Sequence, residues 1–368
     1  MNASLNEKLR TVKWGEFKYK EVFNRIEQGR RLKKDDQIDG TIPFVMSGTT
    51  NAGVVNYISN PVASFPKNAI TIDIFGNTFY RNYAFGAGDD TGVYWNDATA
   101  YSSNAMLFFA VAMQKSMMGR FSYGKKLRSS QSEDFTMHLP VTDDGTIDFD
   151  FMESFIAELE AERVAELSAY LTVSGLDNYE LSNNEMAIIE RYKKHQIPFS
   201  EFEFIKIFNN IKQGRRLKKD DQLPGDIPFV MSGTTNTGVI GYISNPVARF
   251  PKNSITIDIF GNSFYRNYDF GAGDDTGVYW NTEKEYSRTC MLFFAAAMGR
   301  ALRGKYSYGK KLRSSQSIHF KMQLPTKDGK PDYDAMAALI SAVQKLVIKD
   351  VVLYADRKIE KTKDVTKR

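Results

Sequence analysis

The sequence predicts two tandem domains of mixed α/β (α+β) structure, joined and followed by long helices. A stretch of 115 residues occurs twice, each copy is followed by apolar residues at helical spacing, and short apolar segments between glycines fill both copies. The chain has 368 residues and 42% hydrophobic composition. At roughly 100–200 residues per domain, this is enough apolar material for two or three domains.

The repeat runs from Ile26 to Pro140 and again from Ile211 to Pro325, at a constant offset of 185 residues and with 85 identities. A unit of this length exceeds a solenoid repeat and is expected to fold as a domain. Within each copy we expect the segments ITIDIF and MLFFA to be buried strands or short core segments. Glycines are expected to mark the turns between them.

The segments outside the copies have helical character. Residues 148–172 carry apolar side chains at helical spacing with Glu-rich intervals, and Ser182 followed by Glu185 predicts the start of a short helix. The last segment is apolar on more than one side around residues 346–354, so a single partner helix would not cover it. We expect it to pack on the 148–172 helix and on another chain.

These observations divide the chain into four parts. We expect domains at residues 1–147 and 198–331, a central helical spacer at 148–197, and a C-terminal helix at 332–368 that pairs with the central helix. The residues expected to bind a partner chain are Leu346, Val347, Val351, Leu353 and Tyr354.

The net charge of +5 conceals an uneven distribution. Residues 148–197 carry a net charge of −7, residues 14–147 are neutral, and residues 198–331 carry +8. The total excludes a strongly basic protein that coats nucleic acid, and it also excludes an acidic disordered tail. In the total, the negative charge of the spacer nevertheless offsets most of the positive charge of the second copy.

Two basic segments recur in both copies. QGRRLKKDDQ occupies residues 28–37 and 213–222, and SYGKKLRSSQS occupies 122–132 and 307–317. Each combines cations with Gln, Ser and a Gly that permits close approach of the backbone. Such a mixture suits phosphate contacts, with Arg and Gln available for base edges. The alternative is a solvated surface that binds no ligand. Identity between the copies does not exclude it, because a recent gene duplication also leaves surface residues without a function unchanged.

The sequence contains no recognisable catalytic or metal centre. Its three histidines have no histidine counterparts in the other copy, and FGAGDD is followed by a strand-like segment rather than by a helix. We therefore expect turns at both Gly-Asp-Asp sequences and no metal ion. The single cysteine excludes an intramolecular disulfide, and the longest apolar run, eight residues, is too short to span a bilayer. We expect a soluble, cytoplasmic protein.

The order of these motifs resembles the specificity subunits of type I restriction–modification systems and their type IIB (BcgI-like) relatives. The resemblance rests on QGRRLKKDD, on IPFVMSGTTN, on ITID-x-FGN-x-FYRNY, and on the Leu-Pro that precedes a turn and a helix start in each copy. The C-terminal KLVIKDVVLYADRKIEKTK is also similar. The resemblance covers nearly the whole chain.

The resemblance implies a DNA-recognition protein without its own catalysis. In such subunits two target recognition domains are separated by two antiparallel helices that act as a spacer. Methyltransferase subunits bind the helical region and use S-adenosylmethionine, and a restriction subunit with motor activity can join them. This chain would then hold no cofactor itself, and its partners would be double-stranded DNA and methyltransferase subunits.

The near-identity of the two copies predicts the symmetry of the DNA target, which the resemblance alone does not. Antiparallel helices would relate the copies by a twofold axis, so the DNA target should be an interrupted palindrome. A helix of 25 residues spans roughly 37 Å at about 1.5 Å per residue, which places the half-sites about ten base pairs apart.

Candidate DNA-binding residues come from the segments shared by the copies. Those of the first copy are Gln28, Arg30, Arg31, Lys33, Lys34, Ser47, Thr49, Thr50, Asn51, Arg81, Tyr83, Lys125, Lys126, Arg128, Ser129 and Gln131. Those of the second copy are Gln213, Arg215, Arg216, Lys218, Lys219, Ser232, Thr234, Thr235, Asn236, Arg266, Tyr268, Lys310, Lys311, Arg313, Ser314 and Gln316. A structural role is the alternative for the polar turn at 47–51 and for Arg81 and Tyr83. The alternative for the whole chain is an aromatic-rich module that binds carbohydrate or protein.

Overall fold

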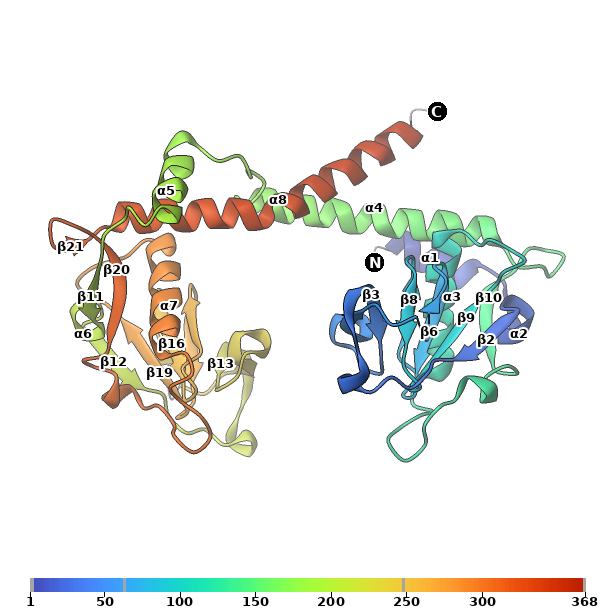
Figure 1. Cartoon of the computed structure of the whole chain (residues 1–368), viewed down its shortest axis with the longest axis horizontal. Coiled ribbons are helices and arrows are strands. Elements are labelled where there is room, and N and C mark those ends of the chain that lie inside the picture. Colours follow the sequence, from blue (N-terminus) through green and yellow to red (C-terminus); the bar gives the residue numbers. More distant parts are fainter. Residues whose placement is uncertain (1–2, 62–63, 247–248, 367–368) are drawn as a thin grey trace. The chain divides into compact units, whose positions relative to one another are not determined.

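The computed structural model describes residues 3–61, 64–246 and 249–366, with side chains described to residue 360. The chain divides into two compact units, residues 1–167 with 355–368 and residues 168–354 (Figure 1). Each unit contains one copy of the repeat. Both copies combine antiparallel strands with helices, as expected for a mixed α/β class.

The first unit is built on two four-stranded sheets. One has the order β2-β9-β6-β7 and is antiparallel throughout; the other has the order β4-β3-β8-β5, in which β3 and β8 are parallel. A smaller sheet pairs β1 with β10. The strands are β1 (Trp14–Lys18), β2 (Arg25–Gln28), β3 (Asp39–Val45), β4 (Val54–Ile58), β5 (Ser64–Phe65), β6 (Ala69–Asp73), β7 (Thr78–Arg81), β8 (Phe85–Ala87), β9 (Thr91–Trp95) and β10 (Thr136–Pro140).

The helices of the first unit cover this framework. Helix α3 contacts β6, β7 and β10, and α4 adds Met152 and Phe155 to the same core. The end of α8 (Tyr333–Thr366) also belongs to this unit, where Lys358 donates a hydrogen bond to Glu160 of α4. The helices are α1 (Ala3–Thr11), α2 (Tyr19–Val22), α3 (Ser103–Met117) and α4 (Phe149–Val173), with short 3-10 turns η1 (Lys34–Asp36), η2 (Thr50–Gly53) and η3 (Ser129–Gln131).

The second unit repeats the two four-stranded sheets, as β12-β19-β16-β17 and β14-β13-β18-β15, with β11-β20-β21 beside them. Its strands are β11 (Phe199–Glu203), β12 (Asn210–Gln213), β13 (Pro224–Val230), β14 (Val239–Ile243), β15 (Arg249–Phe250), β16 (Ser254–Asp258), β17 (Ser263–Arg266), β18 (Phe270–Ala272), β19 (Thr276–Trp280), β20 (Lys321–Lys327) and β21 (Lys330–Pro331). Its helices and 3-10 turns are α5 (Asn183–Lys193), α6 (Phe204–Ile207), α7 (Arg288–Leu302), α8 (Tyr333–Thr366), η4 (Lys219–Asp221), η5 (Thr235–Gly238) and η6 (Ser314–Gln316). Helix α7 contacts β16, β17 and β20 of this framework (Figure 1).

The helical segments follow the sequence pattern closely. Helix α4 has 25 residues, and α5 begins after Ser182, whose side chain accepts a hydrogen bond from the backbone nitrogen of Glu185. The Glu185 side chain accepts one from the Ser182 nitrogen in return, which completes the expected capping box.

The expectation for MLFFA is wrong where it names strands. In both copies this segment lies inside a helix, α3 or α7, whose N-cap is a serine, Ser102 or Ser287. The first of these helices buries Met106, Phe109 and Met113, three or four residues apart, to 1% exposure or less, whereas Leu107 and Val111 are 41% and 66% exposed. The apolar run is therefore one buried face of a helix together with its flanks. The Gly-Asp-Asp sequences do form turns, and each is followed by a strand.

Candidate DNA-binding surface

The backbone of the turn at residues 87–90 accepts hydrogen bonds from both basic segments of the first copy. The Arg30 nitrogen donates to the Ala87 oxygen over 2.9 Å, and Gln28 Nε2 donates to the Asp89 oxygen over 3.0 Å. Arg128, from the other segment, donates to the same Asp89 oxygen. Two segments about 100 residues apart are thus joined into one surface.

The second copy builds the same arrangement. Gln213 Nε2 donates to the Asp274 oxygen over 3.0 Å, and the Arg313 guanidinium donates to that oxygen as well. The Arg215 nitrogen donates to the Ala272 oxygen over 2.9 Å. Because these bonds recur, the arrangement belongs to the repeated unit and not to one copy.

Three of the candidate polar residues in each copy hold this surface together. Gln28 Oε1 accepts from the Ser129 nitrogen over 2.8 Å, and Gln131 Oε1 accepts from the Arg128 nitrogen over 3.0 Å. Ser129 is only 5% exposed, so it lies under the surface. Gln213, Ser314 and Gln316 have the same bonds and burial in the second copy. Their contact with DNA stays a prediction.

Gly29 is required where β2 leaves the sheet. A Cβ at this position would lie 2.1 Å from the Gly88 oxygen and 2.6 Å from the Ala87 oxygen. Gly214 meets the same restriction from the Gly273 oxygen, at 2.1 Å. Real Cβ atoms do not come so near to backbone, so only glycine fits at this position of each QGRR sequence, where two segments of the same domain lie close together. Close approach of DNA to this glycine stays a prediction.

The polar loop at residues 47–51 is held by two buried or half-buried aspartates. The Ser47 nitrogen donates to Asp90 Oδ2 over 2.9 Å, and the Gly48 nitrogen donates to Asp73 Oδ2 over 3.0 Å. Asn51 and Ala52 then adopt φ values of 49° and 50°, in the left-handed region. Two successive non-glycine residues there are uncommon and store strain, which elsewhere marks functional loops.

Arg81 supports this loop from inside the domain. It is 2% exposed and donates to Thr71, to the Tyr83 hydroxyl and to the Ala52 oxygen, the last over 2.6 Å. Burial lowers the pKa of its guanidinium, and the hydrogen bond to Tyr83 offsets part of this effect. Arg266 makes the equivalent bonds to Thr256, Tyr268 and Thr237. The structure thus gives Arg81 and Arg266 a structural role.

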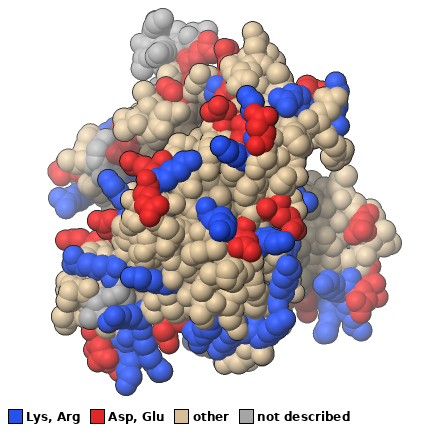
Figure 2. Space-filling view, turned by 90° about the vertical axis from the view of Figure 1, so that its left-hand side faces the viewer, with Lys and Arg blue, Asp and Glu red and all other residues tan. Residues whose placement is uncertain are grey.

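The remaining candidates are exposed. In the first copy these are Arg30, Arg31, Lys33, Lys34, Thr49, Thr50, Asn51, Lys125 and Lys126. In the second copy they are Arg215, Arg216, Lys218, Lys219, Thr234, Thr235, Asn236, Lys310 and Lys311. Figure 2 shows Lys and Arg gathered along the lower edge of the face that it presents. Exposed cations with polar side chains beside them fit a polyanion such as DNA.

One exposed aromatic residue in each copy was absent from the candidates. Tyr123 is 83% exposed and Tyr308 is 82% exposed, at the tip of the second basic segment. Lys126 lies 4.8 Å from the Tyr123 ring centroid, and Lys311 lies 4.6 Å from that of Tyr308. The sequence SYGKK could have indicated these residues, because it places a tyrosine directly before the glycine and the two lysines of the basic segment.

The residues expected to bind a partner form an exposed stripe on α8. Leu346, Val347, Val351 and Tyr354 are between 38% and 73% exposed, and Leu353 is half-buried. Val343 extends the stripe and is 50% exposed. Ala342 and Val352 of the same helix are buried. We call these six residues, Val343 with the five candidates, the α8 stripe.

The structure was also compared with two other kinds of site, a metal centre and a membrane-spanning helix. No three His, Cys, Asp or Glu side chains among them gather in a way that could hold a metal ion. None of the helices, over the residues that the structure describes, has the length and hydropathy to cross a membrane.

Comparison with known proteins agrees with the repeat and with the fold. The sequence model of a family described as type I restriction modification DNA specificity domain matches residues 11–169 and 200–351. Over 155 residues the chain is 29% identical to the specificity subunit S.BcgI of a type II restriction enzyme from Heyndrickxia coagulans, a match that covers 41% of this chain and 45% of that relative. The S subunit of a type I restriction-modification system from M. genitalium has a similar fold, with a TM-score of 0.55 and 14% identity over 96% of this chain and 94% of that one.

Proposed function

Because the chain belongs to the family of type I restriction modification DNA specificity domains, we propose that it recognises DNA for a restriction–modification complex and leaves catalysis to its partners. The observation that carries this proposal is the repeated surface. In both copies two basic segments and a strained polar loop meet on one turn, held by the same hydrogen bonds. A rigid support under exposed Arg, Lys, Thr and Asn side chains suits the reading of base edges beside phosphates.

The target of this surface would be an interrupted palindrome. The exposed candidates are identical in the two copies, including Arg30, Arg31 and Asn51 and their counterparts. Identical side chains on the same framework should read the same bases. If the copies face DNA in opposite orientations, the half-sites are inverted repeats separated by a gap set by the helices.

The partners would be methyltransferase subunits, with a restriction subunit able to join them. The α8 stripe offers an apolar surface for a methyltransferase, since scattered exposed apolar residues are ordinary but a continuous row on one helix is not. S-adenosylmethionine would bind to the methyltransferase and not to this chain.

The test is to map methylated bases in cells that express this chain together with the methyltransferase encoded beside it. We expect methylation at one interrupted palindrome, and none when the chain is omitted. Methylation at two unrelated half-sites would contradict the palindrome alone. Methylation that does not depend on the chain would contradict the recognition role.

A further inference from the structure

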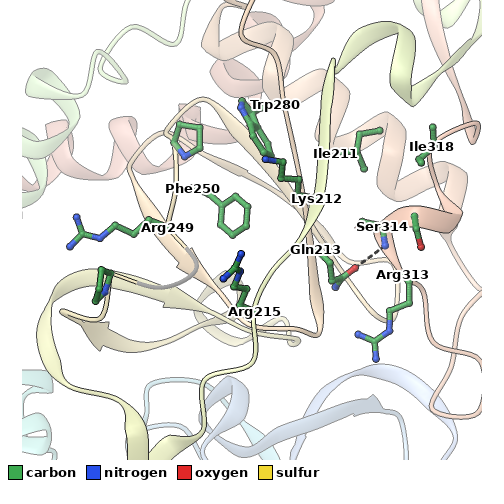
Figure 3. Close-up of a pocket in the computed structure, with 13 residues that line it drawn as sticks. Ile211, Lys212, Gln213, Arg215, Arg249, Phe250, Trp280, Arg313, Ser314 and Ile318 are labelled. Carbon is green, nitrogen blue, oxygen red and sulfur yellow. Dashed lines mark hydrogen bonds between the residues drawn. The ribbon is translucent and has the colours of Figure 1, made fainter.

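The second copy contains an open hollow of about 950 Å³ beside the candidate surface. It lies among β12, β15, β19 and η6, and two aromatic side chains, Phe250 and Trp280, line it (Figure 3). Their rings meet edge to face with centroids 5.9 Å apart, and each residue is only 9% exposed. The hollow therefore has a rigid apolar wall.

Four cations surround this wall. They are Lys212, Arg215, Arg249 and Arg313. In Figure 3 Lys212 extends toward Trp280, with its Nζ 5.7 Å from a ring centroid, Arg215 lies next to Phe250, and Arg249 extends outward at the rim. Among the described residues of this unit the ion pairs involve other cations. The hollow thus carries positive charge that no described carboxylate neutralises.

The first copy differs at two of these four cations and at one further lining residue. Lys212 corresponds to Glu27, Arg249 to Ser64, and Ile318 of the lining to Glu133. Together these three differences make the second copy more positive by four charges. The first domain has a net charge of zero and the second has +8, so these positions account for half of the charge difference between the domains. Phe250 and Trp280 are unchanged as Phe65 and Trp95. The copies therefore share the wall of the hollow and differ in its electrostatics.

The chemistry of this hollow fits phosphate groups. Arg offers paired donors to phosphate oxygens, and an ammonium beside an aromatic ring remains available to a second anion. Gln213, Arg215 and Arg313 belong to both the hollow and the candidate surface, so a DNA strand that follows the surface would continue into the hollow.

We propose that this hollow is an additional site for DNA backbone phosphates, present in the second copy and lost in the first. The inference rests on the proposed function. It means that the two domains read the same bases but bind DNA with unequal strength, because phosphate contacts supply affinity without sequence information. The second domain is then the anchor of the protein on DNA.

The test exchanges the residues that differ between the copies, in the full chain. One variant carries Lys212→Glu and Arg249→Ser, and the reciprocal variant carries Glu27→Lys and Ser64→Arg. A control, Lys327→Glu with Lys330→Ser, makes the same change of charge at an exposed hairpin of the same domain, away from the hollow. Binding to a fluorescent duplex is measured over a range of salt concentrations.

We expect the first variant to weaken binding and to reduce the slope of log affinity against log salt by about two, since each lost phosphate contact removes about 0.9. The reciprocal variant should steepen the slope, and the control should leave it unchanged. Equal slopes for the first variant and the control would overturn the inference. Tight binding of the mononucleotide dAMP that competes with the duplex would also overturn it, because the hollow would then be a small-ligand site.

A second pair of substitutions separates this inference from the proposed function. Lys125→Ala with Lys310→Ala removes exposed cations of the candidate surface in both copies. If that pair weakens binding while the Lys212 and Arg249 variant does not, only the inference fails. If neither variant changes DNA affinity, the proposed function fails as well.

Discussion

Ser129 donates its backbone N–H to Oε1 of Gln28 over 2.8 Å, across 101 residues of sequence. The same glutamine donates through Nε2 to the Asp89 oxygen. One amide side chain therefore joins the end of β2, the turn at 87–90 and η3. It is a residue type that also reads adenine in DNA, and here both of its hydrogen-bonding groups are already used within the domain.

Gln28→Ala should lower the stability of the first domain more than it changes sequence preference. The substitution leaves the Ser129 N–H without its acceptor, which costs about 1–3 kcal/mol for a buried group. It also removes one of the two side-chain donors to the Asp89 oxygen, which keeps its bond from Arg128. Arg30→Ala is the matched comparison, because the exposed Arg30 side chain has no described bond to the domain. We expect Gln28→Ala to lower the melting temperature in thermal unfolding. We expect Arg30→Ala to weaken DNA binding with little effect on the melting temperature. Unchanged stability of Gln28→Ala would contradict its role as a link.

Gly29→Ala should be among the most destabilising single changes in the first domain. The new methyl group would meet the Gly88 oxygen at 2.1 Å, and backbone atoms on both sides must shift. We expect a loss of about 3 kcal/mol, as in strongly overpacked sites. Gly124→Ala is the control, because no atom lies within 4 Å of a Cβ built there. Chemical denaturation of both variants measures the difference, and similar midpoints would be contrary to the prediction.

The parts of the structure that were predictable from sequence are those with a local or repeated signal. The 115-residue repeat indicates two equivalent domains, and Ser182 with Glu185 marks the start of α5. The strand predicted for MLFFA is a helix in the structure, because five apolar residues fit a buried strand or a helix equally well. The longer segment that begins after Ser102 distinguishes the two.

The candidate surface was predictable in its composition but not in its assembly. Exposed cations follow from the basic segments, whereas the roles of Gln28, Ser129 and Arg81 depend on contacts with residues distant in sequence. A pattern of Arg, Gln and Ser is equally typical of DNA contact and of a hydrogen-bonded support. Only the fold assigns each residue to one role.

The stability of the second unit should fall in acid because of Glu185. Burial by itself would raise the pKa of this carboxyl group, but hydrogen bonds from Lys345, Ser341 and Ser182 outweigh burial and lower the pKa from 4.5 to about 2. The carboxylate of the folded state therefore binds protons less readily than that of the unfolded state. Its contribution to stability is complete above about pH 4.5 and is lost as the pH falls toward 2.

Glu185→Gln tests this contribution. The amide keeps the shape but not the charge opposite Lys345, which lies 2.8 Å from the Glu185 carboxylate. We expect lower stability at neutral pH and a weaker dependence of the unfolding free energy on pH between 2 and about 4.5. Parallel pH curves for the two proteins would assign the acid sensitivity to other groups.

The α8 stripe should be required for binding a methyltransferase but not for folding. Val347 is 73% exposed, so Val347→Asp should cost little in stability while it places a charge in an apolar interface. We expect the variant to unfold at nearly the same temperature and to co-purify with much less methyltransferase. Lys349→Asp, on an exposed residue nearby, is the control. Equal recovery of the methyltransferase with both variants would place the docking surface elsewhere.

The length of α4 should set the gap between the half-sites. Helix α4 has 25 residues and follows the first domain, and Lys358 of α8 bonds to its Glu160, so both helices must be lengthened together. Seven added residues in each make two further turns, which keep the apolar faces in phase and add about 10.5 Å. At about 3.4 Å per base pair, methylation mapping should show the same half-sites with a gap about three base pairs longer.

An insertion of seven residues at 174–181 is the matched control for this change. That segment connects α4 to α5 without regular helix, and connecting loops accept added length at little cost. We therefore expect an unchanged gap. If lengthening the helices leaves the gap unchanged, or if the loop insertion alters it, the spacing is not measured along α4. If the half-sites themselves change, recognition depends on the helices as well as on the exposed side chains of the two domains.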